Sequence, residues 1–180
     1  MTPTLSVREI QEKDIIPLVN YWFDSTDEHL IGMGVDLKKL PPKEDLTKAL
    51  KRQISLPLDQ KMSYGLIWEM NEKAIGHSNV NPVEYGSSGK MHLHLWQSGN
   101  RQKGIGFMLV KKSLPYFFEN LKLKVLYCEP YALNPAPNKT LEKIGFEFVK
   151  KYTTVPGSIN FEQEVCQWRL TRQQYLDLFG

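Results

Sequence analysis

The chain has 180 residues, of which 41% are hydrophobic and 24% are charged, and its formal net charge at pH 7 is +3. This length fits one domain with a buried core, and the composition excludes an intrinsically disordered chain. So small a net charge does not predict nucleic-acid binding, although it suits an anionic small ligand. Residues 1–14 contain no long apolar run, which predicts neither a signal peptide nor a membrane span. We therefore expect one cytoplasmic domain over residues 1–180, with Cys128 and Cys166 as reduced thiols.

Apolar periodicity and turn residues predict interleaved strands and helices in the first half of the chain. The clearest strand signal is the strict alternation in KMHLHLWQ, residues 90–97. Asp14 is a candidate N-cap for the first helix. The expected strands are residues 5–10, 63–70, 74–83 and 90–97, and the expected helices are residues 15–25 and 41–55.

The second half continues this alternation. A helix is expected from Gly104 to Asn120, distorted near Pro115, and another one ends at Gly145. The remaining expected elements are strands at residues 124–131, 146–155 and 161–171, a helix at residues 137–145 and a terminal helix at residues 172–179. Interleaved elements with hairpins at both ends predict an α/β or α+β fold with a mixed sheet.

A basic turn with two glycines joins the strand at residues 90–97 to the helix that follows it. Gly104 and Gly106 let the chain turn sharply and let a ligand approach the backbone. The first N–H groups of the helix lack partners within the helix and carry partial positive charge, to which Arg101 and Lys103 add full charges. The turn therefore predicts a site for a phosphate group or pyrophosphate. The alternative is an ordinary helix start with solvated basic residues.

The spacing in this turn excludes two other phosphate loops. No P-loop sequence is present, and Leu109 stands where a dinucleotide-binding fingerprint has its third glycine.

Two motifs, in this order, resemble those of the GNAT family, the acetyl-CoA-dependent N-acetyltransferases. Residues 101–106, RQKGIG, match the family's pyrophosphate loop, [RQ]-x-x-G-x-[GA]. Asn134, Lys143, Gly145 and Phe146 match offsets of its second signature, N-x-x-[AS]-x-x-x-Y-x-K-x-G-F. The resemblance covers roughly residues 62 to 150. Beyond it, the chain is loosely similar to aminoglycoside- and siderophore-type acetyltransferases and to ribosomal-protein N-acetyltransferases.

The resemblance implies a fold, a cofactor and a set of contacts. The fold is a mixed, mostly antiparallel sheet of about seven strands, flanked by helices, in which the fourth and fifth strands splay apart. The co-substrate is acetyl-CoA, whose pantetheine chain would bind the backbone exposed by the splay. The residues that the resemblance assigns to the cofactor are His94, Leu95, Trp96, Arg101, Gln102, Lys103, Gly104, Ile105, Gly106, Phe107, Asn134 and Asn138.

The second signature departs from the family pattern at two positions. Leu141 stands where many members have the tyrosine that protonates the leaving thiolate, and Pro137 replaces the usual small residue. Tyr131 is a candidate substitute for the missing acid, and a water molecule is an equal alternative.

The general base has more than one candidate. Glu129 lies at the end of the fifth strand, five residues before Asn134, where some family members have a catalytic carboxylate. His92 and His94 share one strand face with Trp96, and histidine titrates in a suitable range. We expect Glu129 to be the base, with His94 as the runner-up; ordinary packed or solvated side chains are the alternative. No metal is expected, because the histidine pair has no close third ligand.

The acceptor side is expected between the first two helices and near the loop before the fourth strand. Its candidates are Trp22, Asp24, His29 and Tyr85, since acidic and aromatic side chains together suit a cationic amine. The resemblance implies acetyl transfer to a small amine, by a monomer or homodimer without nucleic-acid or membrane partners. The alternatives are a protein N-terminal acetyltransferase and a catalytically silent CoA-binding domain.

Overall fold

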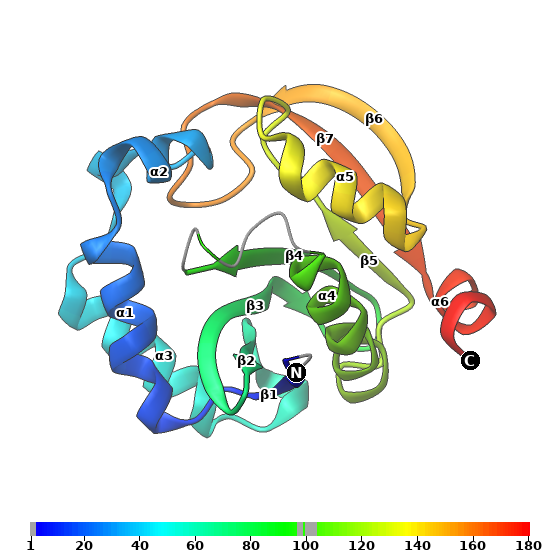
Figure 1. Ribbon diagram of the computed structural model, residues 1–180, viewed down its shortest axis with the longest axis horizontal. Helices are drawn as coiled ribbons and strands as arrows, with labels where there is room; N and C mark the ends of the chain where they lie inside the picture. Colours follow the sequence, from blue (N-terminus) through cyan, green and yellow to red (C-terminus); the bar gives the residue numbers. More distant parts are fainter. Residues whose placement is uncertain (1–2, 97–98, 100–103) are drawn as a thin grey trace.

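The computed structural model describes residues 3–96, 99 and 104–180. Within these residues, seven strands form one sheet in the order β1-β2-β3-β4-β5-β7-β6, with helices on both faces (Figure 1). The strands are β1 (Leu5–Glu9), β2 (Tyr64–Met70), β3 (Lys73–Glu84), β4 (Ser88–Leu95), β5 (Val125–Cys128), β6 (Glu147–Thr154) and β7 (Gln163–Thr171). The helices are α1 (Ile15–Asp24), α2 (Asp27–Gly32), α3 (Lys43–Ser55), α4 (Ile105–Pro115), α5 (Pro135–Ile144) and α6 (Arg172–Phe179). The mixed, mostly antiparallel sheet of the prediction is confirmed.

The two central strands, β4 and β5, are parallel and pair over only part of their length. Their register runs from Ser88 opposite Val125 to Met91 opposite Cys128, and β5 ends there while β4 continues to Leu95. Figure 1 shows the two strands separating toward their carboxyl ends. The predicted splay is therefore present, and it leaves the end of β4 without β5 beside it.

Alternation along β4 divides its side chains between two environments. Met91, Leu93 and Leu95 pack with the hydrophobic core that α4 and α5 share with the sheet. At the heart of this core, the indole N–H of Trp68 donates to the hydroxyl of Ser113 on α4 at 2.9 Å. The other face of β4 points toward α1 and α3, and that face carries the histidines.

The helix predicted from Gly104 to Asn120 changes its winding at the expected place. α4 ends at Pro115, and a π-helical turn, η5, continues over Tyr116–Asn120. Proline has no backbone N–H to donate within a helix, which explains the irregular turn.

Two local features differ from the prediction. The carboxylate of Asp14 does not cap α1: it accepts two hydrogen bonds from Arg8, at 2.6 and 2.8 Å, and one from the N–H of Gln11 at 2.8 Å. The six-residue helix α2 was not predicted, because it is too short to show a helical period. Thr26 caps it by accepting the N–H of His29.

Candidate active site

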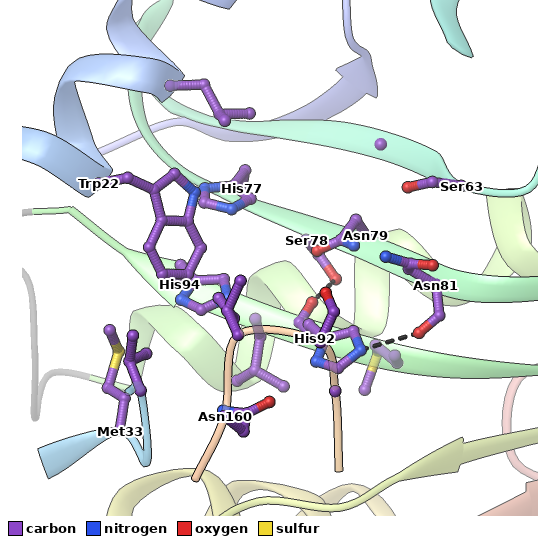
Figure 2. Close-up of a pocket in the computed structure, with 18 of the residues that line it drawn as sticks. Trp22, Met33, Ser63, His77, Ser78, Asn79, Asn81, His92, His94 and Asn160 are labelled. Carbon is purple, nitrogen blue, oxygen red and sulfur yellow. Dashed lines mark hydrogen bonds between the residues drawn. The ribbon is translucent and has the colours of Figure 1, made fainter. Parts of the chain in front are cut away.

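A cavity of about 610 Å³ lies beside the point at which β4 and β5 separate. Its walls come from α1 and α3, from the faces of β2, β3 and β4, from the segment after β5, and from the loop between β6 and β7. Figure 2 shows part of this lining, with Trp22 beside the histidines of β3 and β4.

The centre of the cavity is a cluster of histidine and aromatic rings. His77 on β3 lies opposite His94 on β4, and their rings stack with centroids 4.6 Å apart. The Trp22 ring meets the His94 ring edge-on at 5.0 Å. Burial lowers the pKa of His77 to about 3, and burial together with the neighbouring histidines lowers the pKa of His94 well below 6.5. Both rings are therefore neutral at pH 7.

Hydrogen bonds fix which ring nitrogen carries the proton in His77 on β3 and in His92 on β4. The Trp96 indole N–H donates to Nδ1 of His77 at 2.8 Å, so the proton of neutral His77 is on Nε2. Nε2 of His92 lies 2.9 Å from the carbonyl oxygen of Asn81 (Figure 2). A carbonyl only accepts, so Nε2 of His92 is a donor.

His94 is linked by a tyrosine to a further histidine. The hydroxyl of Tyr21, on α1, lies 3.3 Å from Nδ1 of His94 and 3.2 Å from Nε2 of His29. The Tyr21 ring is buried, so this hydroxyl holds the His94 ring from the side away from solvent. Tyr21 and His77 could not be assigned to the site from the sequence, because neither the packing of α1 nor the register of β3 is visible in it.

Glu129 is held in a network of its own. One oxygen lies 2.5 Å from Nζ of Lys90, and the other accepts hydrogen bonds from Tyr152 and Gln167, both at 2.6 Å. Burial acts to raise the pKa of Glu129, but the Lys90 ammonium and the two other donors outweigh it and lower the pKa below its ordinary value. Lys90, Tyr152 and Gln167 contact both oxygens of Glu129, so neither oxygen is open to a substrate proton, which argues against the predicted role of Glu129 as general base.

The N-terminus of α4 has the form expected of an anion site. Gly104 precedes the helix with φ of 72°, a left-handed conformation that favours glycine, and a side chain added there would meet nothing within 4 Å. Ile105, Gly106 and Phe107 form the first turn, and Nζ of Lys143 on α5 lies 4.8 Å above the Phe107 ring. The prediction for Arg101, Gln102 and Lys103 lies outside the described residues.

The backbone N–H and C=O groups at the end of β4 point alternately toward β3 and toward the side of β5. The N–H of Trp96 donates to the carbonyl of Ile75 at 2.9 Å, so it faces β3. Because backbone direction alternates along a strand, the backbone groups of Leu93 and Leu95 face the side of β5. Of the predicted segment His94–Trp96, Leu95 is therefore the residue whose backbone is directed into the splay.

The segment after β5 carries three further predicted site residues, and also Leu141, which stands in place of the family tyrosine. Tyr131 and Asn134 both line the cavity, and Asn134 begins α5 without a side-chain capping bond. The Asn138 amide is engaged inside the chain: it donates to the carbonyls of Tyr131 and Asn134 and accepts the indole N–H of Trp168. Leu141 is fully buried in the core, which leaves no room there for a tyrosine ring without repacking.

The four predicted acceptor residues do not come together. Trp22 lines the cavity, and His29 is connected to it through Tyr21. Asp24 is exposed at the end of α1, and Tyr85 is exposed beyond the far end of β3, and neither lines the cavity. The sequence pattern did not reveal this, because Trp22 and Asp24, both in the last turn of α1, point in different directions once the helix forms.

Two features of the described residues bear on other functions. None of these residues form a group of three or more His, Cys, Asp or Glu side chains placed to hold a metal ion. In the same part of the chain, no helix combines the length and the apolar character that crossing a membrane requires.

The protein-family model for the acetyltransferase (GNAT) domain matches residues 4–147, which is most of the chain. The chain belongs to the GNAT family. It is therefore an acyltransferase that uses acetyl-CoA as co-substrate. No curated protein sequence matches the chain significantly.

Solved structures with the same fold share little sequence with this GNAT protein. The spermidine N-acetyltransferase from Vibrio cholerae, in complex with CoA and spermine, has a TM-score of 0.77 and 18% identity, over 96% of this chain and 98% of that one. The RimL ribosomal L7/L12 α-N-protein acetyltransferase, in complex with coenzyme A, has a TM-score of 0.76 and 12% identity, over 95% and 96%. An uncharacterized protein from Bacillus halodurans has a TM-score of 0.70 and 16% identity, over 97% and 88%.

Proposed function

We propose that this protein transfers the acetyl group of acetyl-CoA to a primary amine of a small molecule, by direct attack in a ternary complex. The observation that carries the proposal is the neutral histidine cluster, which lines a cavity at the splay of β4 and β5. An amine bound in this cavity would lie beside a thioester held in the splay. Holding two reactants together in this way supplies a large part of a rate enhancement.

The residues around the splay fit acetyl-CoA, which supplies the acetyl group as an activated thioester. The backbone of Leu93 and Leu95 would bind the pantetheine amides, in the manner of a peptide added to a strand edge. The N–H groups at the start of α4 would hold the pyrophosphate, since Gly104 brings no side chain to cover them. Asn134 lines the cavity at the same end and would bind the pantetheine chain.

We assign the role of general base to His94. An alkylammonium must lose a proton before it can attack, and His94 lines the cavity and is unprotonated at pH 7. Its lowered pKa makes it a weaker base than a free imidazole, so the proposal rests on its position and on a ring nitrogen that can present a lone pair to the substrate. In the tautomer that accepts, Nδ1–H of His94 donates to the Tyr21 oxygen and Tyr21 O–H donates to Nε2 of His29. Nε2 of His94 then has the lone pair that takes the proton.

Tyr131 is the proposed acid for the leaving thiolate. It lines the cavity immediately after β5, and its ring is held edge-on against Phe161 at 5.7 Å. A water molecule in the same place would serve if the Tyr131 hydroxyl does not reach the sulfur.

The test is the turnover number, kcat, of His94→Gln, with His92→Gln as the matched control. His92 occupies the same strand face, but its Nε2 is bound to Asn81. We expect His94→Gln to lower kcat by about 100-fold or more, because it removes a general base. His92→Gln should lower kcat by less than about tenfold, and both variants should keep the wild-type affinity for acetyl-CoA.

The outcome separates three possibilities. Equal losses in the two variants would mean that His94 is not the base. Tight binding of acetyl-CoA without turnover of any amine in the wild type would instead support a silent CoA-binding domain. Acetylation of a protein N-terminus in preference to every small amine would support the protein acetyltransferase.

A further inference from the structure

We infer that the acceptor is a monoamine with an apolar body, and neither a polyamine nor a protein N-terminus. This inference rests on the proposed acetyl transfer, and it concerns the charge, the walls and the closure of the cavity.

The cavity offers little negative charge to a substrate. Among the described residues that line it, only Glu9 and Glu129 carry carboxylates. Glu129 is engaged with Lys90, and Glu9 accepts the hydroxyl of Tyr64 at 2.5 Å and lies near the ammonium of Lys61. Lys61 itself lines the cavity and offsets the charge of Glu9.

The histidines of the cavity add no positive or negative charge at neutral pH. Burial lowers the pKa of His77, His92 and His94, so the rings stay neutral. A polyamine carries several ammonium groups at neutral pH, and each one taken out of water without a partner is costly. A monoamine has only the amino group that reacts, so no further ammonium stays charged and unpaired in the cavity during attack.

The walls that α1 and α3 contribute beside the histidines are mostly apolar, and Gln53 is their one polar member among the described lining residues. On α1 the wall carries Leu18, Trp22 and Phe23, and on α3 it carries apolar residues at helical spacing. These α3 residues are Leu46, Leu50 and Ile54. Such walls favour an aromatic or aliphatic body by removing its surface from water.

Two segments that line the cavity are joined to each other and form a roof over part of it. The roof consists of residues 33–39, after α2, and residues 156–163, between β6 and β7, which lie side by side in Figure 1. Members of both segments line the cavity. The hydrogen bonds that join the segments are Asp36 N–H to Ile159 O at 2.8 Å, Asn160 Nδ2 to Gly34 O at 2.9 Å, Gln163 Nε2 to Gly34 O at 2.8 Å, and Lys39 Nζ to Asn160 O at 2.8 Å.

A joined roof is unfavourable for a protein substrate. A protein N-terminus must continue away from the reacting amine as an extended chain, and a path between these two segments would require the four bonds to break. A small amine fits beneath the roof without disturbing it, since a cavity of this volume is typical of small-molecule sites.

The experiment compares three acceptors under the same conditions, with release of free CoA as the readout. The acceptors are 2-phenylethylamine, spermidine and a tetrapeptide with a free N-terminal serine. We expect kcat/KM for 2-phenylethylamine to exceed that for each of the others by about 100-fold or more. A higher value for spermidine or for the peptide would overturn the inference.

A pair of matched variants tests whether the lack of negative charge in the apolar wall is the reason that spermidine is disfavoured. Leu50→Asp puts a carboxylate into the apolar wall, and Leu50→Asn has the same shape without the charge. The quantity compared is kcat/KM for spermidine divided by kcat/KM for 2-phenylethylamine. We expect this ratio to be higher in Leu50→Asp than in Leu50→Asn by about tenfold or more. Equal ratios in the two variants, both folded by circular dichroism, would mean that charge does not decide the selection.

Failure of acetyl transfer itself is a separate result. If none of the three amines increases CoA release, the proposed function is wrong, and calorimetry in the presence of CoA then tests the acceptor class directly. Binding of 2-phenylethylamine in preference to spermidine supports the inference, whereas the reverse order or no binding of 2-phenylethylamine overturns it.

Discussion

At the residue scale, the partners of a side chain decide its chemistry more than its position in a motif does. Glu129 has the position of a base at the end of β5, yet a lysine and two further donors engage it. His94 lies in a hydrophobic strand pattern, yet the fold leaves it neutral and directed into the cavity. Sequence could name both residues as candidates, but the contacts from β4, β6 and β7 to Glu129 and from α1 to His94 distinguish them.

Glu129→Gln therefore tests a structural role. Removing the buried partner of Lys90 should lower the free energy of unfolding by about 2–4 kcal/mol, because an uncompensated charge remains. Activity per folded molecule should fall by less than about tenfold. Glu164→Gln is the control: it breaks the exposed pair with Lys151 and should leave the stability nearly unchanged. A variant that is as stable as the wild type but has lost its turnover would restore Glu129 as the base.

At the element scale, the sequence predicted most strands and helices because each has a clear period or an end signal. The alternation of β4, the proline in α4 and the left-handed Gly145 after α5 are examples that the structure confirms. What the sequence could not supply was the short helix α2 and the pairing register. The register is what brings His77 opposite His94.

Gly104→Val tests whether the turn at Gly104 and the start of α4 bind the pyrophosphate of CoA. A β-branched side chain at a positive φ is strained, and it would occupy the open space at the start of α4. We expect the Kd for CoA to rise by about tenfold or more, measured by calorimetry. Gly32→Val is the control, because Gly32 also has open space around it but lacks a positive φ. Unchanged CoA affinity in a folded Gly104→Val protein would remove the pyrophosphate from this turn.

At the scale of the whole molecule, the site joins two parts of the chain that the motifs treat separately. The cofactor motifs lie in α4 and α5, whereas the acceptor walls come from α1 and α3, whose sequences match no motif. Tertiary packing across the sheet forms the cavity, so its neutral and apolar character could not be predicted from sequence. The same packing buries histidines that are kept neutral, so the free energy of unfolding of the entire fold should depend on pH.

The free energy of unfolding should fall as the pH drops below about 6.5, the ordinary pKa of histidine in an unfolded chain. The pKa of His77 is lowered to about 3 in the fold, so between these values the unfolded chain binds a proton that the folded chain does not. His77 alone should then cost roughly 3 kcal/mol of stability between pH 6.5 and pH 4. In denaturant titrations across this range, His77→Gln should show a shallower decline than the wild type.

Asp14→Asn provides the contrast, because burial acts to raise the pKa of Asp14 but its bonds with Arg8 lower it overall. A carboxylate of this kind contributes stability above its unfolded pKa of about 4 and loses that stability only as the pH falls further. In Asp14→Asn, the free energy of unfolding should therefore decline between pH 6.5 and pH 4 as steeply as in the wild type. If His77→Gln and the wild type decline in parallel from pH 6.5 to pH 4, His77 is not held neutral by the fold.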